Sequence, residues 1–455
     1  MSPRVRALAA TGQVGTGFLE QSLRTGADGA DFIGSDAGST DQGPYYLGSG
    51  ETQASDAAVR RDLGLMLATG LAAGIPVLVG TAGTAGGRPH LARTVRLARE
   101  LARENGWHFK LAVIDSELDK DFLVQALHAG RITPLDPAPE LDEEIIHKAE
   151  RIVGMMGAEP FQRALAAGAQ VVIAGRSTDT SIFAAYPIQH GIPTGIAWHA
   201  GKILECGTAA VEQRLHPDSL VADMDADGFT VWPPNPAMAC TPASVVSHTL
   251  YENADPYHLL EPGGMLDSTT CTYEAVEGHA VRVTGSRFVP SADYTVKLEG
   301  AMLVGYRSVA IGGVRDPLVI RQLDSYLDGA QASIRRKVRD SLGLEPDQYL
   351  LKMRVYGRDA SMGALEPTTR VTGHEAGVLI DVIAETQSTA RAIITIAWHT
   401  TLHHPVPEYS GLVSNLAFPY SPPGIDAGPA YRFCTNHVLH LGDPCEPFAM
   451  TLEDV

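Results

Sequence analysis

The chain of 455 residues carries a formal net charge of -18, and 44% of its residues are hydrophobic and 19% charged. This length and apolar content predict a folded protein of two or three domains and exclude a long disordered chain. The acidic surplus repels phosphate backbones and anionic lipid surfaces, so we expect neither a nucleic-acid partner nor a membrane partner.

The cysteines and the N-terminal residues indicate the cellular compartment. The five cysteines form no CxxC pair, which argues against both a disulfide framework and a structural zinc site. The first residues lack the apolar stretch and cleavage site of a signal peptide, and no apolar run is long enough to cross a bilayer. We therefore expect a cytoplasmic protein.

Residues 1–220 are predicted to form an α/β ligand-binding domain with glycine-rich loops. Apolar runs typical of buried parallel strands, such as 75–79 and 111–114, alternate with segments of helical periodicity. Two of those segments, 91–102 and 141–152, repeat apolar residues at helical spacing. The alternation predicts a parallel sheet with covering helices.

A second domain is predicted after residue 220. The stretch 216–242 is rich in proline and aspartate, which is typical of a domain junction. Beyond it, Asp316 and the proline that follows predict a helix start, and Gly343 predicts its end. We predict an α+β domain over 221–409 and a C-terminal extension, 410–455, that packs on the body.

Three loops of Gly, Ser, Thr and Asp, at 34–50, 80–87 and 175–181, each follow a predicted strand. In a parallel sheet such loops lie at one edge, where α/β proteins bind ligands. Because glycine-rich turns present backbone N–H groups to anions, we expect a small anionic metabolite there. The predicted substrate-binding residues are Gly38, Ser39, Thr40, Tyr45, Thr81, Gly83, Thr84, Arg176, Ser177 and Thr178. The alternative is that these residues only cap helices and shape turns.

Aspartates in these loops are candidates for proton transfer or for cation binding. Asp36, Asp41 and Asp179 can act as general acids or bases if neighbouring carboxylates raise their pKa values. In a second interpretation, Asp36, Asp41 and Asp115 hold a hard cation such as Mg²⁺, because Asp115 follows another strand to the same edge. A third interpretation gives them only hydrogen bonds to loop N–H groups.

A predicted helix over 193–215 carries further catalytic candidates. His199, Lys202 and Cys206 have the spacing of one helix face, and a Cys/His face next to the loops can hold a nucleophile or a proton shuttle. The alternative is that Cys206 is a small buried hydrophobe and His199 an interior imidazole. The sequence contains no G-x-x-x-x-G-K-[ST], GxSxG or HExxH motif.

Four segments carry a family resemblance. The longest is DFIGSDAGSTDQGPYYLGSG at 31–50, joined by GTAGTAGG at 80–87, AGRSTDTS at 174–181 and HAGKILECG at 199–207. Together they resemble the acyclic terpene utilisation (AtuA) family over most of the first half of the chain. The resemblance implies a catabolic role in pathways that break down branched isoprenoid acids as coenzyme A thioesters, with a small partner subunit beside some members. It implies no particular reaction.

Residue chemistry then predicts the reaction class. A site with anion binding and several carboxylates, but no nucleotide motif, favours a hydratase/dehydratase or a double-bond isomerase acting on a small branched carboxylic acid or its acyl-CoA thioester. Two alternatives stay open. One is an amide, ester or thioester hydrolase with Ser39, Ser177 or Cys206 as nucleophile, and the other is a non-catalytic ligand-binding subunit of a pathway complex. A homo-oligomer is expected for a metabolic protein of this size.

Overall fold

A computed structural model describes residues 3–368, 373–409 and 414–455 of the chain. The chain divides into two compact units, one made of Met1–Met302 with Phe433–Val455 and the other of Leu303–Arg432. No helix in the described ranges is both long and apolar enough to cross a membrane.

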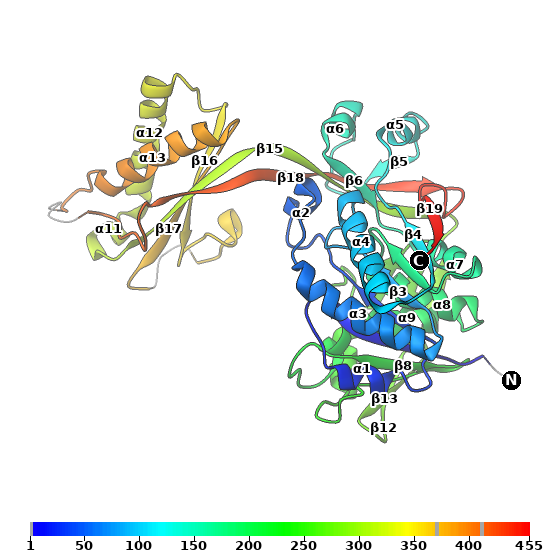
Figure 1. The fold of residues 1–455 in the computed structure, drawn as a ribbon. Helices are drawn as coiled ribbons and strands as arrows, with labels where there is room; N and C mark the ends of the chain where they lie inside the picture. Colours follow the sequence, from blue (N-terminus) through cyan, green and yellow to red (C-terminus); the bar gives the residue numbers. More distant parts are fainter. Residues whose placement is uncertain (1–2, 369–372, 410–413) are drawn as a thin grey trace. The chain divides into compact units, whose positions relative to one another are not determined.

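The first unit is built on a ten-stranded sheet (Figure 1). Its central strands are parallel and lie in the order β1 (Val5–Gln13), β2 (Phe32–Asp36), β3 (Val77–Gly80), β7 (Val171–Ala174) and β4 (Lys110–Ile114). These strands are buried on both faces, which explains why the sequence reads as nearly continuous apolar runs. The predicted parallel sheet of an α/β fold is confirmed.

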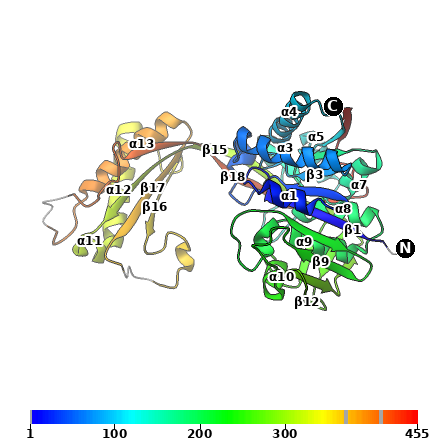
Figure 2. The same cartoon turned by 60° about the horizontal axis from the view of Figure 1, so that its bottom comes forward.

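Helices cover both faces of this sheet, as Figure 2 shows for α3 and α4 on one side and α8 and α9 on the other. Alternate residues of β1 therefore enter two cores, with Leu8 in one and Ala9 in the other. The helices of the first core are α1 (Glu20–Gly26), α3 (Asp56–Ala73) and α4 (Arg88–Asn105). Those of the second are α5 (Lys120–His128), α7 (Glu159–Ala166), α8 (Asp179–Gln189) and α9 (Thr194–Leu204).

Antiparallel strands extend the sheet at both edges. Next to β1 lie β8 (Leu220–Met224), β9 (Gly228–Trp232), β13 (Ala280–Thr284) and β12 (Thr272–Val276), and next to β4 lies β19 (Met450–Asp454). A separate small sheet contains β10 (His258–Glu261), β11 (Gly264–Asp267) and β14 (Arg287–Pro290). The remaining elements of this unit include α2 (Tyr45–Ser49), β5 (Ile132–Pro134), α6 (Glu143–Lys148), β6 (Arg151–Gly154) and α10 (Pro242–Thr249).

The second unit is an antiparallel sheet with helices packed on it, as the α+β prediction requires. Two long strands, β15 (Tyr294–Val314) and β18 (Gly424–Leu441), each begin in one unit and end in the other. Within the second unit β17 (Ala376–Ala384) pairs with both β15 and β16 (Tyr349–Tyr356). Its helices are α11 (Pro317–Arg321), α12 (Leu323–Leu342) and α13 (Gln387–His403).

Capping residues bound the long helical segment of the second unit. The Asp316 side chain accepts hydrogen bonds from the N–H groups of Leu318 and Val319, so it caps α11 as predicted. Gly343 adopts a left-handed conformation at the end of α12, which confirms the predicted helix end. A turn at Gln322 separates the two helices.

Two sequence-based expectations differ from the structure because distant strands pair. The predicted helix over 141–152 is interrupted: α6 is short, and the following residues form β6, which pairs with β15. The units also divide the chain differently from the predicted domains 1–220, 221–409 and 410–455, because β8 and β19 join the sheet of the first unit. Residues 410–413 of the predicted extension lie outside the described ranges.

The loops that follow β3 and β7 pack directly against each other. Thr81 donates its backbone N–H to the carbonyl of Gly175 at 2.9 Å. Gly86 has a φ of +70°, and a Cβ built on it would lie 2.2 Å from the backbone nitrogen of Arg176. The loop at 80–87 therefore packs against the loop at 175–181, with no room for a side chain at Gly86.

We expect Gly86→Ala to lower the free energy of unfolding by about 2 kcal/mol or more, because a left-handed φ and a backbone clash act together. Gly106→Ala is the matched control, since Gly106 has a φ of +65° and a Cβ built on it would meet nothing within 4 Å. That variant keeps only the backbone strain and should lose about 1 kcal/mol. Urea unfolding measures both, and equal losses would contradict this account.

Candidate functional site

A cleft of about 280 Å³ lies in the first unit, where the loops after β1, β2 and β7 meet. It lies at the carboxyl edge of the parallel strands, where α/β sheets bind ligands. The lining residues are Gly12, Gln13, Thr16, Asp36, Gly38, Ser39, Asp41, Gln42, Asp179, Glu205, Cys206, Arg214, Tyr251 and Glu252. The cleft thus brings together the predicted residues Asp36, Gly38, Ser39, Asp41, Asp179 and Cys206.

Asp36 and Asp179 form an electrostatically coupled pair of carboxyl groups. Asp36 ends β2 and is 6% exposed, and burial first, then the neighbouring Asp179, raises its pKa well above the ordinary range. Its Oδ2 accepts a hydrogen bond from the N–H of Gly38 at 3.0 Å. Its buried Oδ1 has no hydrogen-bond partner among the described residues.

Asp179 is the first residue of α8 and is partly open to solvent, with 35% of its side chain exposed. Its Oδ1 atom is buried and lies 3.5 Å from Nη1 of Arg176. Burial raises the pKa of Asp179 to about 7; the Arg176 charge opposes this rise, and Glu205 and Asp41 support it. This pair can therefore hold a proton near neutral pH, which is the property of a general acid or base.

Arg176 is an internal counter-ion and does not line the cleft. Its buried guanidinium donates from Nε to Oε2 of Glu299 at 2.8 Å and from Nη1 to the carbonyl of Ser177 at 3.2 Å. Burial lowers the Arg176 pKa, but Glu299 and Asp179 outweigh burial and raise it overall. The expectation that Arg176 captures the substrate anion is thus corrected, because carboxylates of the protein already occupy it.

A second buried ion pair lies beside the cleft. Lys202, on α9, donates from Nζ to Oε1 of Glu205 at 2.6 Å, and Thr180 donates to Oε2 of Glu205 at 2.9 Å. Burial raises the pKa of Glu205 in spite of this pairing. Burial and then Glu205 also raise the pKa of Cys206, so the thiol stays protonated at neutral pH.

The cleft carries a surplus of acid. Five carboxyl groups and a single guanidinium, that of Arg214, line it among the described residues. Arg214 is exposed and makes no ion pair with any described residue. Ser39 donates to Oδ2 of Asp41 at 2.8 Å at the open side. An anionic substrate would therefore need Arg214 or a further positive charge.

Several predicted binding residues lie outside the cleft lining. Thr81 and Thr84 turn inward and are buried, and Ser177 is fully buried with its Oγ unpartnered within the described part of the chain. Thr178 caps α8, as the alternative interpretation of this loop expects. The other residues of this group are Thr40, which hydrogen-bonds to Glu299, Gly83, which packs against His90, and Tyr45, on the exposed surface of α2.

The predicted cation ligands do not assemble. Asp115 pairs with Arg88 at 2.7 Å, and β7 and β3 separate its strand, β4, from the strand of Asp36. Among the described residues the grouping of three potential ligand side chains is instead Glu205, Cys206 and His248. The proposed Mg²⁺ set of Asp36, Asp41 and Asp115 is thus corrected by the strand order.

His199 belongs to the interior. Its ring nitrogens contact the hydroxyls of Ser286 at 2.8 Å and Thr249 at 3.0 Å, and burial lowers its pKa to about 3. Helix α9 ends at Leu204, so Cys206 lies beyond the helix and does not share a face with His199. This corrects the predicted common face, and His199 matches the alternative of an interior imidazole.

Sequence reasoning missed Glu205, Arg214 and Glu252 as cleft residues and His248 as their neighbour. Glu205 immediately precedes Cys206 in the segment HAGKILECG, so its proximity to the candidate thiol was a usable signal. The others come from segments that approach the cleft only through β8 and α10, and no local motif marks them.

Comparison with known families decides the relationship. The model of the acyclic terpene utilisation family protein AtuA matches residues 59–414, which is well over half of the 455 residues. The chain belongs to the AtuA family. No curated protein and no solved structure matches the chain. Of the motifs that carried the resemblance, those at 80–87, 174–181 and 199–207 fall inside the match, whereas 31–50 precedes it.

The buried Asp36 generates a pH-dependent prediction. A carboxyl group whose pKa is raised by folding stabilises the protein fully only below its ordinary pKa of 3.8. That contribution is lost as pH rises towards the folded value. Asparagine cannot ionise, so Asp36→Asn avoids this loss of stability at high pH. The variant should be more stable than the wild type by about 1 kcal/mol or more at about pH 8 and by much less at about pH 4.

Chemical unfolding at both pH values checks this prediction. Asp41→Asn is the control, because the Asp41 side chain is exposed. A stabilisation by Asp36→Asn that does not change with pH would show that the carboxylate charge carries no penalty in the fold.

Proposed function

We propose that this AtuA-family protein catalyses proton transfer next to the carbonyl of a branched carboxylic acid or its acyl-CoA thioester, as a hydratase/dehydratase or a double-bond isomerase. The observation that carries the proposal is that Asp36 and Asp179, both with raised pKa values, line the same cleft. The family's role in acyclic terpene utilisation favours a branched acyl substrate.

The two carboxyl groups have different surroundings, which suits a division into acid and base. In dehydration, ionised Asp179 takes the proton from the carbon next to the carbonyl. Protonated Asp36 donates its proton to the departing hydroxyl, which leaves as water. Hydration is the reverse. In isomerisation, the proton that one carboxylate removes returns to a different carbon of the same allylic system.

Arg214 supplies the charge that holds the substrate in this proposal. It lines the cleft, and its exposed guanidinium is unpaired within the described residues. A guanidinium can bind a carboxylate or a phosphate with two parallel hydrogen bonds. The Asp36 and Asp179 side chains would then face the carbons next to the bound carbonyl.

Hydrolysis by a nucleophilic side chain has weaker support. The Cys206 thiol is protonated because its pKa is raised, and Ser177 is fully buried. Ser39 does donate to Asp41, but no histidine lies among the described lining residues to act as its base. A covalent acyl adduct on any of these side chains, detected by mass spectrometry, would favour hydrolysis over proton transfer.

The test of the proposal is Asp179→Asn assayed on branched 2-enoyl and 3-hydroxyacyl thioesters. We expect the wild-type protein to interconvert them or to exchange the proton next to the carbonyl in D₂O, and Asp179→Asn to lose at least about 100-fold in rate. Asp115→Asn is the matched control, because Asp115 follows β4 at the same sheet edge but outside the cleft lining.

Three outcomes distinguish the alternatives. Equal loss in both variants would mean that the substitutions act through stability, which unfolding curves report directly. An unaffected Asp179→Asn would exclude the acid-base assignment. Thioester binding by the wild type, with no turnover or exchange until a second protein is added, would favour the non-catalytic subunit.

A further inference from the structure

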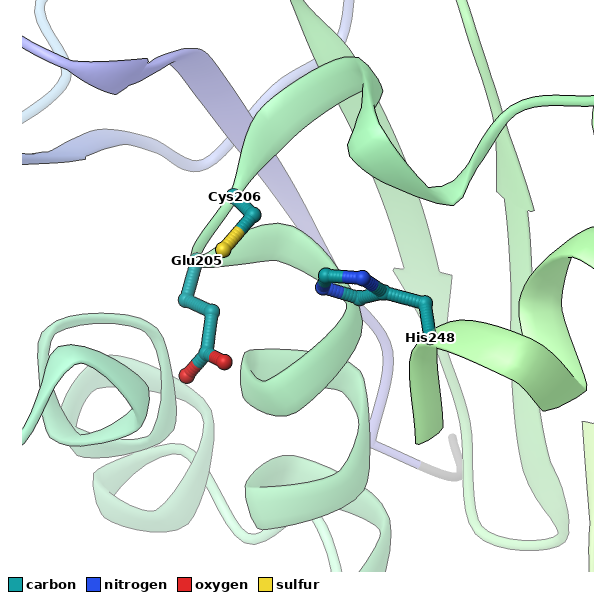
Figure 3. A group of neighbouring side chains, drawn as sticks. All are labelled: Glu205, Cys206 and His248. Carbon is teal, nitrogen blue, oxygen red and sulfur yellow. The ribbon is translucent and has the colours of Figure 1, made fainter. Parts of the chain in front are cut away.

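The cluster of Glu205, Cys206 and His248 has the donor set of a transition-metal site. The ligand atoms of these three side chains all lie within 4.8 Å of one another. Figure 3 shows the imidazole of His248, from α10, pointing toward the other two side chains at the end of α9. Thiolate, imidazole and carboxylate are the protein ligands that bind Zn²⁺.

The strongest evidence that this cluster can bind an ion is at His248. The residue is 4% exposed, yet its Nε2 has no hydrogen-bond partner among the described residues. The ring also hydrogen-bonds to the backbone carbonyl of Lys202, and because Nε2 has no partner, we assign this bond to Nδ1. When the N–H of one ring nitrogen donates to a backbone carbonyl, the proton stays on that nitrogen. The other nitrogen, here Nε2, then keeps its lone pair free, as in histidines that bind metals. A buried lone pair without a partner is otherwise costly.

Glu205 is held in the manner of a metal-binding carboxylate. Lys202 donates to one of its oxygens and Thr180 to the other, and each oxygen keeps a second lone pair. Hydrogen bonds of this kind orient ligating carboxylates in metal sites. The charges of Lys202 and Arg214 both act on His248 and oppose a further cation. Three carboxylates, those of Glu205, Asp179 and Glu252, act on the Cys206 thiol and outnumber them.

The cluster lies in the wall between two pockets. Cys206, Arg214 and Tyr251 line both the acidic cleft and a second pocket of about 540 Å³, which His248 also lines. Three protein ligands beside open space are the arrangement of a catalytic zinc ion, whose fourth position takes water or substrate. The ligand atoms of a tetrahedral Zn²⁺ ion lie about 3.5 Å apart. Side-chain rotations that move the ligand atoms by about 1 Å would bring the three side chains to this spacing.

We propose that Glu205, Cys206 and His248 bind one Zn²⁺-like divalent ion with an open coordination position facing the cleft, and that the Cys206 thiol releases its proton to solvent when the ion binds. The ion supplies positive charge to a cleft whose lining is mainly acidic, and its open position can bind the carbonyl oxygen of a substrate or a water molecule. Metal binding by these residues does not rest on the proposed reaction.

Co²⁺ titration of the full-length, chelator-treated protein tests the site. We expect a single Co²⁺ ion per chain, with a thiolate-to-cobalt absorption band that Zn²⁺ displaces and excess Mg²⁺ does not. Cys206→Ser should abolish the band, and His248→Gln should weaken Co²⁺ binding by at least about tenfold. Cys445→Ser is the matched control, because Cys445 is also a partly buried free cysteine but lies outside the cluster.

The proposal fails if the wild type binds no Co²⁺, if Cys206→Ser keeps the band, if Cys445→Ser loses it, or if Mg²⁺ displaces the ion. Melting curves of the metal-free variants identify a folding defect. If Cys206→Ser is unstable, the loss of Co²⁺ affinity in His248→Gln tests the site instead. Stoichiometric Co²⁺ binding without turnover of acyl thioesters would support the metal site and count against the proposed reaction alone.

Discussion

A buried guanidinium organises the edge of the sheet where the cleft lies. Arg176 follows β7 and, in an interior that solvates ions poorly, requires carboxylate partners at fixed positions. Glu299 on β15 and Asp179 at the start of α8 provide them. The loop after β3 packs against the same residue through Gly86 and Thr81. This ion pair network therefore fixes where Asp179 lies relative to Asp36.

The same network leaves the cleft with more negative charge than it can hold fully ionised. Burial raises the pKa of Asp36 well above its ordinary range and that of Asp179 to about 7, and Arg176, which also pairs with Glu299, only partly opposes these shifts. Buried carboxyl groups with raised pKa values destabilise a fold at pH values above their ordinary pKa, and such groups concentrate at functional sites. Both proposals depend on this surplus of carboxyl groups. In the acid-base proposal the carboxyl groups supply the proton, and in the metal-site proposal they attract the cation.

The metal-site and acid-base groups belong to one region of the first unit. Glu205 connects the two groups. Its carboxylate, which would bind the ion, accepts hydrogen bonds from Lys202 and from Thr180, and Thr180 is next to Asp179 in the chain. A metal-bound carbonyl and a nearby carboxyl pair are complementary, since the ion stabilises the charge that develops when the neighbouring carbon loses a proton. Every described residue that lines this cleft belongs to the first unit.

The sequence by itself determined the parallel sheet, the helix caps and the meeting of the loops after β2 and β7, because hydrophobic periodicity and capping act locally and the loops after parallel strands lie at one sheet edge. It also identified Asp36, Asp41 and Asp179, which lie in those loops. Only the tertiary structure decided that Arg176 pairs internally, that Asp115 lies beyond two intervening strands from Asp36, and that His248 approaches Cys206. These outcomes depend on pairings between distant segments, such as β6 with β15 and β8 with β1. Local residue patterns cannot specify which distant partner desolvates or neutralises a side chain.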